Sequence, residues 1–147
     1  MSLEDLLNEG HLKRYRSSRR EIGQLLDVFK RDITDARITG LSLDRQFESA
    51  YNAVLILSKA ALAASGYRTF GEGNHYWTIK SLLFTLGMND IFINTLNKFR
   101  HIRNVSNYEM TGMVSKKEVK EMISLGEELY TRLIKWLEEN QSDLFTT

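Results

Sequence analysis

The side chains best suited to chemistry stand close together at residues 99–109, which carry two arginines, a histidine and two asparagines. Four of them recur at helical spacings and form one polar stripe: Arg100, Arg103, Asn104 and Asn107. A guanidinium offers a rigid fork of N–H donors that matches phosphate and carboxylate oxygens. The stripe therefore predicts an anion clamp, and the alternative is a solvated helix face with local ion pairs.

The remaining candidates for chemistry are sparse. His75 stands at the predicted start of a helix, where it is a candidate anion ligand, with capping or packing as its alternative role. His101 shares a helical face with Asn104 and Tyr108. Such a face is more often a solvent-exposed surface than a site. The acidic residues are scattered, and there is no glycine-rich phosphate loop, paired-histidine zinc motif or nucleophile elbow. We therefore expect no metal and no cofactor.

One strong run of cations surrounds Tyr15, at residues 13–20. Lysine and arginine around an aromatic ring are typical of phosphate contacts, so this run is a second candidate for nucleic-acid binding. The commoner alternative is a solvated loop that leads into a helix. The sequence leaves both readings open.

Composition narrows the class of protein. The chain has 147 residues, of which 42% are hydrophobic and 27% charged, as in a globular domain. It has no proline, which permits long helices, and no cysteine, which excludes disulfides and thiolate metal sites. The net charge of +1 argues against a protein that coats nucleic acid by charge alone. With no signal-peptide pattern and no apolar stretch of the ~20 residues that a membrane span needs, we expect a cytoplasmic protein without a membrane segment.

Hydrophobic periodicity places these residues on helices. After a short helical start within residues 1–12, apolar residues recur at helical spacing from about 18 to 36, 43 to 65, 74 to 87, 88 to 108 and 115 to 139. No segment shows the alternation of a strand. The sequence predicts a single all-α domain over 1–147, an up-and-down bundle of about five helices. Residues 1–17 are its N-terminal extension, and 140–147 a flexible tail.

Several short segments carry a family resemblance. Ala-Tyr-Asn-Ala-Val at 50–54, Lys-Ala-Ala-Leu at 59–62 and Ser-Gly-Tyr-Arg at 65–68 resemble the central helix of HEPN-domain proteins and the loop after it. His75 matches that family's histidine at the start of the next helix, and residues 100–108 are similar to its signature helix. The resemblance covers residues 45–110 and implies a HEPN-like bundle. It also implies a homodimer in which the signature helices of two subunits face each other across a cleft.

The same resemblance implies an activity, and the sequence departs from the family's signature at one position. Active members are metal-independent ribonucleases whose signature is arginine, a polar residue, three spacers and histidine, and many are toxins paired with a nucleotidyltransferase antitoxin. Arg103 and Asn104 match the first two positions, but Tyr108 replaces the histidine. A phenol with a pKa of about 10 is only ~0.1% ionised at pH 7, which disfavours it as a base.

The sequence therefore predicts a non-catalytic HEPN-type protein that binds RNA, a nucleotide or a nucleotidyltransferase partner. Its expected ligand-binding residues are Arg100, Arg103, Asn104, Asn107 and His75. The first alternative is an active endoribonuclease with Arg103 and Tyr108 as catalytic residues. The second is a protein-interaction module in which the polar stripe only fixes the dimer.

Overall fold

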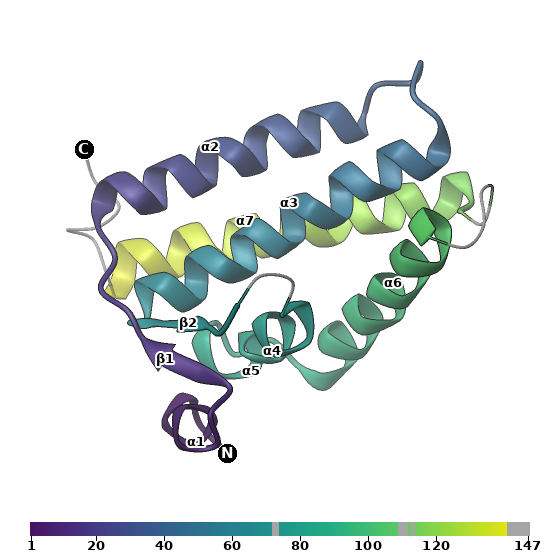
Figure 1. Cartoon of the computed structure of the whole chain (residues 1–147). Helices are drawn as coiled ribbons and strands as arrows, with labels where there is room; N and C mark the ends of the chain where they lie inside the picture. Colours follow the sequence, from purple (N-terminus) through teal and green to yellow (C-terminus); the bar gives the residue numbers. More distant parts are fainter. Residues whose placement is uncertain (72–73, 109–111, 113, 141–147) are drawn as a thin grey trace.

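The computed structural model describes residues 1–71, 74–108, 112 and 114–140. For residues 105–108 the description covers the backbone and not the side chains. The described chain is mostly helical, so the predicted all-α fold is confirmed (Figure 1). In chain order the elements are α1 (Leu3–Asn8), β1 (Leu12–Arg14), α2 (Arg19–Ala36), α3 (Leu43–Ala64), β2 (Tyr67–Thr69), α4 (His75–Lys80), α5 (Leu82–Thr85), α6 (Asp90–Tyr108) and α7 (Lys116–Asn140).

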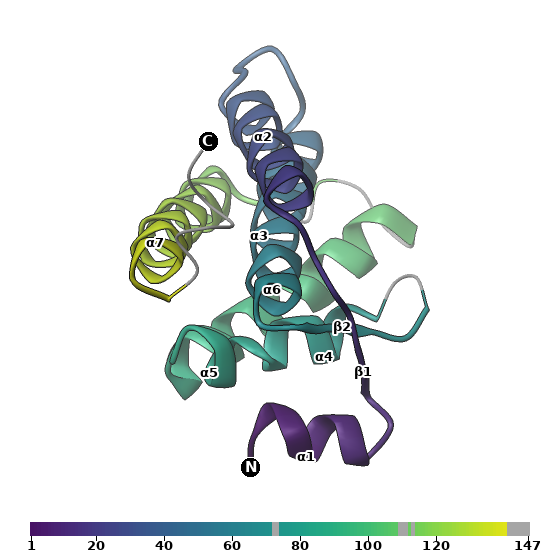
Figure 2. The same cartoon turned by 90° about the vertical axis from the view of Figure 1, so that its left-hand side faces the viewer.

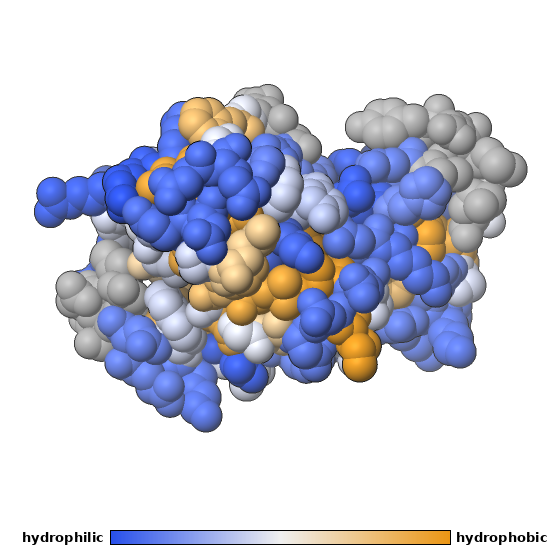
Figure 3. Space-filling model, turned by 90° about the horizontal axis from the view of Figure 1, so that it is seen from below, coloured by the Kyte–Doolittle hydropathy of each residue, from blue (hydrophilic) through white to orange (hydrophobic). Residues whose placement is uncertain are grey.

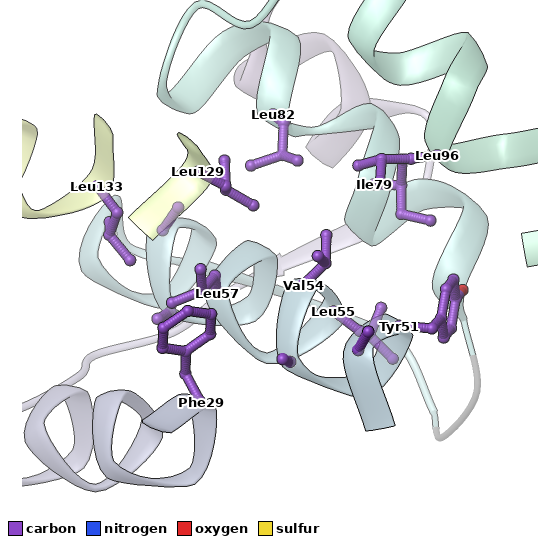
Figure 4. Close-up of a cluster of buried hydrophobic side chains, with 14 of the residues drawn as sticks. Phe29, Tyr51, Val54, Leu55, Leu57, Ile79, Leu82, Leu96, Leu129 and Leu133 are labelled. Atoms are coloured by element: carbon purple, nitrogen blue, oxygen red, sulfur yellow. The ribbon is translucent and has the colours of Figure 1, made fainter. Parts of the chain in front are cut away.

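Helix α3 forms the centre of the molecule. It lies beside both α2 and α7, and α4, α5 and α6 pack on its other side (Figures 1 and 2). Its buried alanines keep it slim, so that neighbouring helices approach closely. Leu57 of α3 lies among Phe29 of α2 and Leu129 and Leu133 of α7 (Figure 4). Burying each such side chain stabilises the fold by roughly 1.5–3 kcal/mol.

Helix starts follow the sequence signals closely. Ser42 directly precedes an apolar periodic stretch, which predicts it as an N-cap. Its Oγ accepts a hydrogen bond of 3.2 Å from the backbone N–H of Arg45, so Ser42 is the N-cap of α3. At α7 the Ser115 Oγ accepts from the N–H of Glu118 at 3.1 Å, and the Glu118 carboxylate accepts from the N–H of Ser115 at 3.0 Å. The Ser-x-x-Glu spacing at 115–118 predicts a capping box, and these two hydrogen bonds confirm it.

Gly126 marks the closest approach of α7 to its neighbours. The sequence places it on the buried face of the last helix, where a glycine is justified by a close helix crossing. A Cβ at this position would lie 3.3 Å from Ile33 Cδ1 and 3.4 Å from Val54 Cγ2, so the crossing is confirmed. By contrast, a Cβ on Gly23 of α2 would meet nothing within 4 Å.

We expect Gly126→Val to destabilise the protein by about 1–3 kcal/mol, because the branched side chain overpacks the crossing of α7 with α2 and α3. Gly23→Val is the matched control. It introduces the same side chain into an open helical position, where valine and glycine differ little in helix propensity. Urea unfolding of both variants measures the effect. Equal stability of the two variants would contradict a tight crossing.

The prediction that no segment forms a strand is wrong at two places. β1 pairs antiparallel with β2, with Leu12 opposite Thr69, Lys13 opposite Arg68 and Arg14 opposite Tyr67. Both strands fall in segments expected to be loop or helical start. A strand of three residues is too short to show a period of two, and the pairing depends on a partner more than 50 positions away, so the pattern carried no signal.

The N-terminal extension packs firmly against the rest of the chain. Leu6 of α1 and Leu12 of β1 are buried against Leu62 of α3, and Figure 2 shows α1 and the strands below that helix. The predicted helix over 74–87 is interrupted at Ser81, which is buried and donates to the carbonyl of Thr78. The predicted tail beyond Asn140 lies outside the described residues.

Helical spacing predicts a buried side of α6 that includes Ile91, and this prediction is wrong for Ile91. Ile91 is 76% exposed, whereas Phe92, Leu96 and Phe99 are buried as expected. The face seen from below carries hydrophobic side chains near its middle, with hydrophilic ones around them (Figure 3). No helix within the described part of the chain is long and apolar enough to cross a membrane.

Candidate functional site

The two arginines of the predicted clamp both lie over aromatic rings. Arg103 of α6 places its Cζ 5.6 Å from the ring centroid of Tyr51, which belongs to α3. Arg100, one turn earlier, places its Cζ 5.8 Å from the ring centroid of Tyr76 of α4. Cations in such positions are attracted to the electron-rich ring face, and the contacts hold both guanidiniums near the junction of three helices.

Arg103 is poorly neutralised for a cation with so little exposure to water. Its side chain is only 16% exposed, and its nearest carboxylate among the described residues, that of Glu48 of α3, lies 4.0 Å from Nη2, which is too far for a hydrogen bond. Nη1 donates a weak hydrogen bond of 3.4 Å to Asn104 Oδ1, and the buried Nε has no protein acceptor among the described residues. Hydrogen-bond donors therefore remain free for an anion.

Tyr51 and His75 form the second half of the site. Tyr51 is 1% exposed and stands at the edge of the hydrophobic cluster in Figure 4. Its hydroxyl lies 3.2 Å from Nδ1 of His75, the first residue of α4. When Tyr51 donates to Nδ1, the neutral imidazole carries its proton on Nε2, which is then a donor toward other groups.

Electrostatics keep both groups in their neutral forms. Burial raises the pKa of Tyr51 to about 12, although the nearby charges of Arg103 and Arg100 work against the increase. Burial also lowers the pKa of His75 to about 4, and the positive charges of Arg103, Lys59 and Arg100 add to that effect. His75 therefore lies inside a region of positive potential and is uncharged at neutral pH.

We call Tyr51, His75, Arg100 and Arg103 the Arg–His cluster. It brings together His75 and the two arginines, three of the residues predicted from the sequence, and Asn104 joins it through Arg103. The side chains of Asn107 and Tyr108, the other predicted site residues, lie outside the described residues. His101 is exposed and makes no contact with the cluster in the described structure.

Sequence reasoning missed the contributions of α3 to this site. Helical spacing predicts Tyr51 as a core residue, and neither Glu48 nor Lys59 is among the site residues predicted from the sequence. The spacing of three between Glu48 and Tyr51 places both on one side of α3, which is a usable signal. The sequence alone does not say that this side faces the arginines of α6.

The cluster suits anions better than metals. Within residues 1–71, 74–108, 112 and 114–140, no group of three or more histidines, cysteines and acids is arranged to hold a metal ion. The donors of the cluster are guanidinium and imidazole N–H groups, which match phosphate or carboxylate oxygens. The chain matches no protein-family model, and no curated protein matches it.

Proposed function

We propose that the protein binds the phosphate of an RNA strand or a nucleotide through the Arg–His cluster, as a binding protein rather than a nuclease. The single observation behind this proposal is the under-neutralised guanidinium of Arg103, which is largely buried and lies 4.0 Å from Glu48, its nearest carboxylate in the described part of the chain. A buried cation without close compensation is costly, and a bound phosphate removes that cost.

The other charges of the cluster support an anionic ligand. Arg100 lies one turn from Arg103 on the same side of α6, and its guanidinium is held over Tyr76. His75 contributes an uncharged N–H donor rather than a second cation. Both arginines lie near enough to His75 to act on it electrostatically. Two guanidiniums beside a neutral donor suit a single phosphate group, to which Arg supplies bidentate contacts.

The resemblance to HEPN-domain proteins adds the biological context to this proposal. It implies a homodimer and a nucleotidyltransferase partner, and both remain predictions. A partner protein would reach the same guanidiniums with a carboxylate side chain. The proposal is for phosphate, because the aromatic rings of Tyr51 and Tyr76 beside the arginines also suit a nucleic-acid ligand.

We expect Arg103→Gln to weaken binding of a fluorescent single-stranded RNA by about ten- to a hundredfold, because charge-assisted hydrogen bonds to phosphate are lost. Arg37→Gln is the matched control. It removes the same charge from an exposed arginine at the end of α2, which pairs with Glu127 on the surface. Fluorescence anisotropy at fixed salt measures both affinities, with AMP as competitor to test whether a mononucleotide suffices.

A third variant separates binding from folding. Glu48→Gln removes the carboxylate nearest to Arg103 and should strengthen RNA binding by roughly two- to fivefold, since the local potential becomes more positive. Opposite effects of Arg103→Gln and Glu48→Gln are not produced by general damage to the fold. Equal affinities of wild type, Arg103→Gln and Arg37→Gln, with intact helical circular dichroism, would overturn the proposal.

A further inference from the structure

A second candidate site lies toward the C-terminal end of α3, where the short sheet meets α2 and α4. It is a cavity of about 460 Å³, within the range of about 300–1,000 Å³ found for small-molecule sites. Lys13 of β1, Arg68 of β2 and Lys59 of α3 line it. It was not anticipated from the sequence, although Lys13 begins the cationic run at residues 13–20.

The strand register places two of these cations directly against each other. Lys13 is the antiparallel partner of Arg68, so both side chains project from the same face of the two-stranded sheet and both line the cavity. Like charges directly opposite each other on paired strands are destabilising. An anion bound between Lys13 and Arg68 offsets this repulsion in the folded chain.

Among the residues that the structure describes, no carboxylate pairs with the three cations. Lys13, Lys59 and Arg68 form no ion pair with any described residue, and Glu21 is the one described acid that lines the cavity. Its two carboxylate oxygens already accept hydrogen bonds from the Tyr15 hydroxyl at 2.5 Å and the Ser17 hydroxyl at 2.6 Å. Three cations and one carboxylate leave a local charge of about +2, which matches the −1.5 to −2 of a phosphate monoester at pH 7.

The rest of the lining is suited to an apolar group. Leu62 and Ala63 of α3 are almost fully buried and, with Leu25 of α2, form the apolar part of the wall. The hydroxyls of Thr69 and Thr78 also line the cavity, 3.4 Å from each other. A ligand that fills this space therefore combines a doubly charged head with an apolar or aromatic body.

We propose that this cavity binds a small phosphate monoester that carries an apolar or aromatic body, with Lys13, Arg68 and Lys59 around the phosphate. The site is separate from the Arg–His cluster, and the proposal does not depend on the function assigned to that cluster. Lys59 lies between the two, because it lines the cavity and also acts electrostatically on His75.

Calorimetric titration with phenyl phosphate tests the proposal, with inorganic phosphate and phenol as the two halves of the probe. We expect phenyl phosphate to bind more tightly than either half. Lys13→Gln and Arg68→Gln should each weaken its binding about tenfold or more, through loss of a charged hydrogen-bond donor. Lys30→Gln, an exposed lysine of α2 outside the cavity lining, is the matched control and should bind like wild type.

Arg103→Gln distinguishes the two sites. It should leave unchanged the phenyl phosphate binding that Lys13→Gln and Arg68→Gln weaken, if that binding takes place in the cavity. Loss of binding in Arg103→Gln, but not in Lys13→Gln and Arg68→Gln, would assign the ligand to the Arg–His cluster. That result would overturn the proposal for the cavity and leave the proposed function of the cluster standing. Binding of phenol as tight as that of phenyl phosphate, or no binding of phenyl phosphate at millimolar concentration, would also overturn it. Circular dichroism of each variant confirms that it is folded.

Discussion

Incubation of the wild-type protein with mixed-sequence RNA at pH 7, in the presence of a chelator, is expected to give no more than trace cleavage. Attack by the 2′-hydroxyl of RNA needs a base that titrates near neutrality, and such a base contributes about 10²–10⁴-fold to the rate. In the Arg–His cluster the pKa of His75 is lowered to about 4 and that of Tyr51 is raised to about 12. The first is too weak a base and the second too weak an acid for this proton transfer.

The informative comparison uses wild type, Tyr108→His and Arg103→Gln. On a straight helix, residue 108 points about 140° away from Arg103, so the two meet at one phosphate only through a bend or across a dimer. Cleavage that appears in Tyr108→His and disappears in the double variant with Arg103→Gln would show a site that lacks only its base. His101→Gln is the control, because His101 is exposed and points about 160° from Arg103. Robust, Arg103-dependent cleavage by the wild type would contradict the non-catalytic proposal.

The helices were predictable because their signals are local. Ser42 and the Ser115–Glu118 pair cap helices wherever they occur before an apolar periodic stretch, and the structure places both as predicted. The pairing of Lys13 with Arg68 was not predictable, because it depends on a turn of the chain rather than on either segment alone. Ile91 shows the same limit. Its spacing fits the buried face, but it lies in the first turn of α6, where no neighbouring element covers it.

Half of the candidate site was predictable for a similar reason. Arg100 and Arg103 are one turn apart, so a helix brings them together whatever surrounds it. The partners that define their chemistry come from α3, and the contact of Arg103 with Tyr51 and Glu48 exists only after α3 and α6 have packed. The neutrality of His75 is likewise a tertiary effect, since burial and cations from two other helices cause it.

His75 is expected to titrate far below an ordinary histidine, with a pKa of about 4 against a usual value of about 6.5. The cause is burial first, followed by the positive charges of Arg103, Lys59 and Arg100. Nuclear magnetic resonance of the imidazole C–H signals between pH 3.5 and 8 measures it, and His75→Gln assigns the signal. A midpoint near 6.5 would show that His75 is exposed to water and not enclosed by the cluster.

The lowered pKa also sets the sign of a stability change. Above pH 6.5 His75 is neutral in both the folded and the unfolded chain, so it makes no contribution to pH dependence. Between pH 6.5 and about 4 the unfolded chain binds the proton and the folded chain does not, so stability falls as the pH falls. After allowance for solvent screening of this partly exposed group, the loss is about 1–2 kcal/mol. His75→Gln should lose less stability than wild type or His101→Gln between pH 7 and 5.

A bound phosphate should move this titration in the opposite direction. The anion offsets the positive potential of Arg103 and Arg100 and favours the protonated imidazole, so the midpoint of His75 should rise by about one pH unit when RNA or AMP is added. Glu48→Gln should lower the midpoint in the free protein, because the carboxylate nearest to Arg103 is removed. An unchanged His75 midpoint at saturating RNA would place the ligand outside the Arg–His cluster. A rise in wild type that is absent in Arg103→Gln would place the phosphate beside that guanidinium.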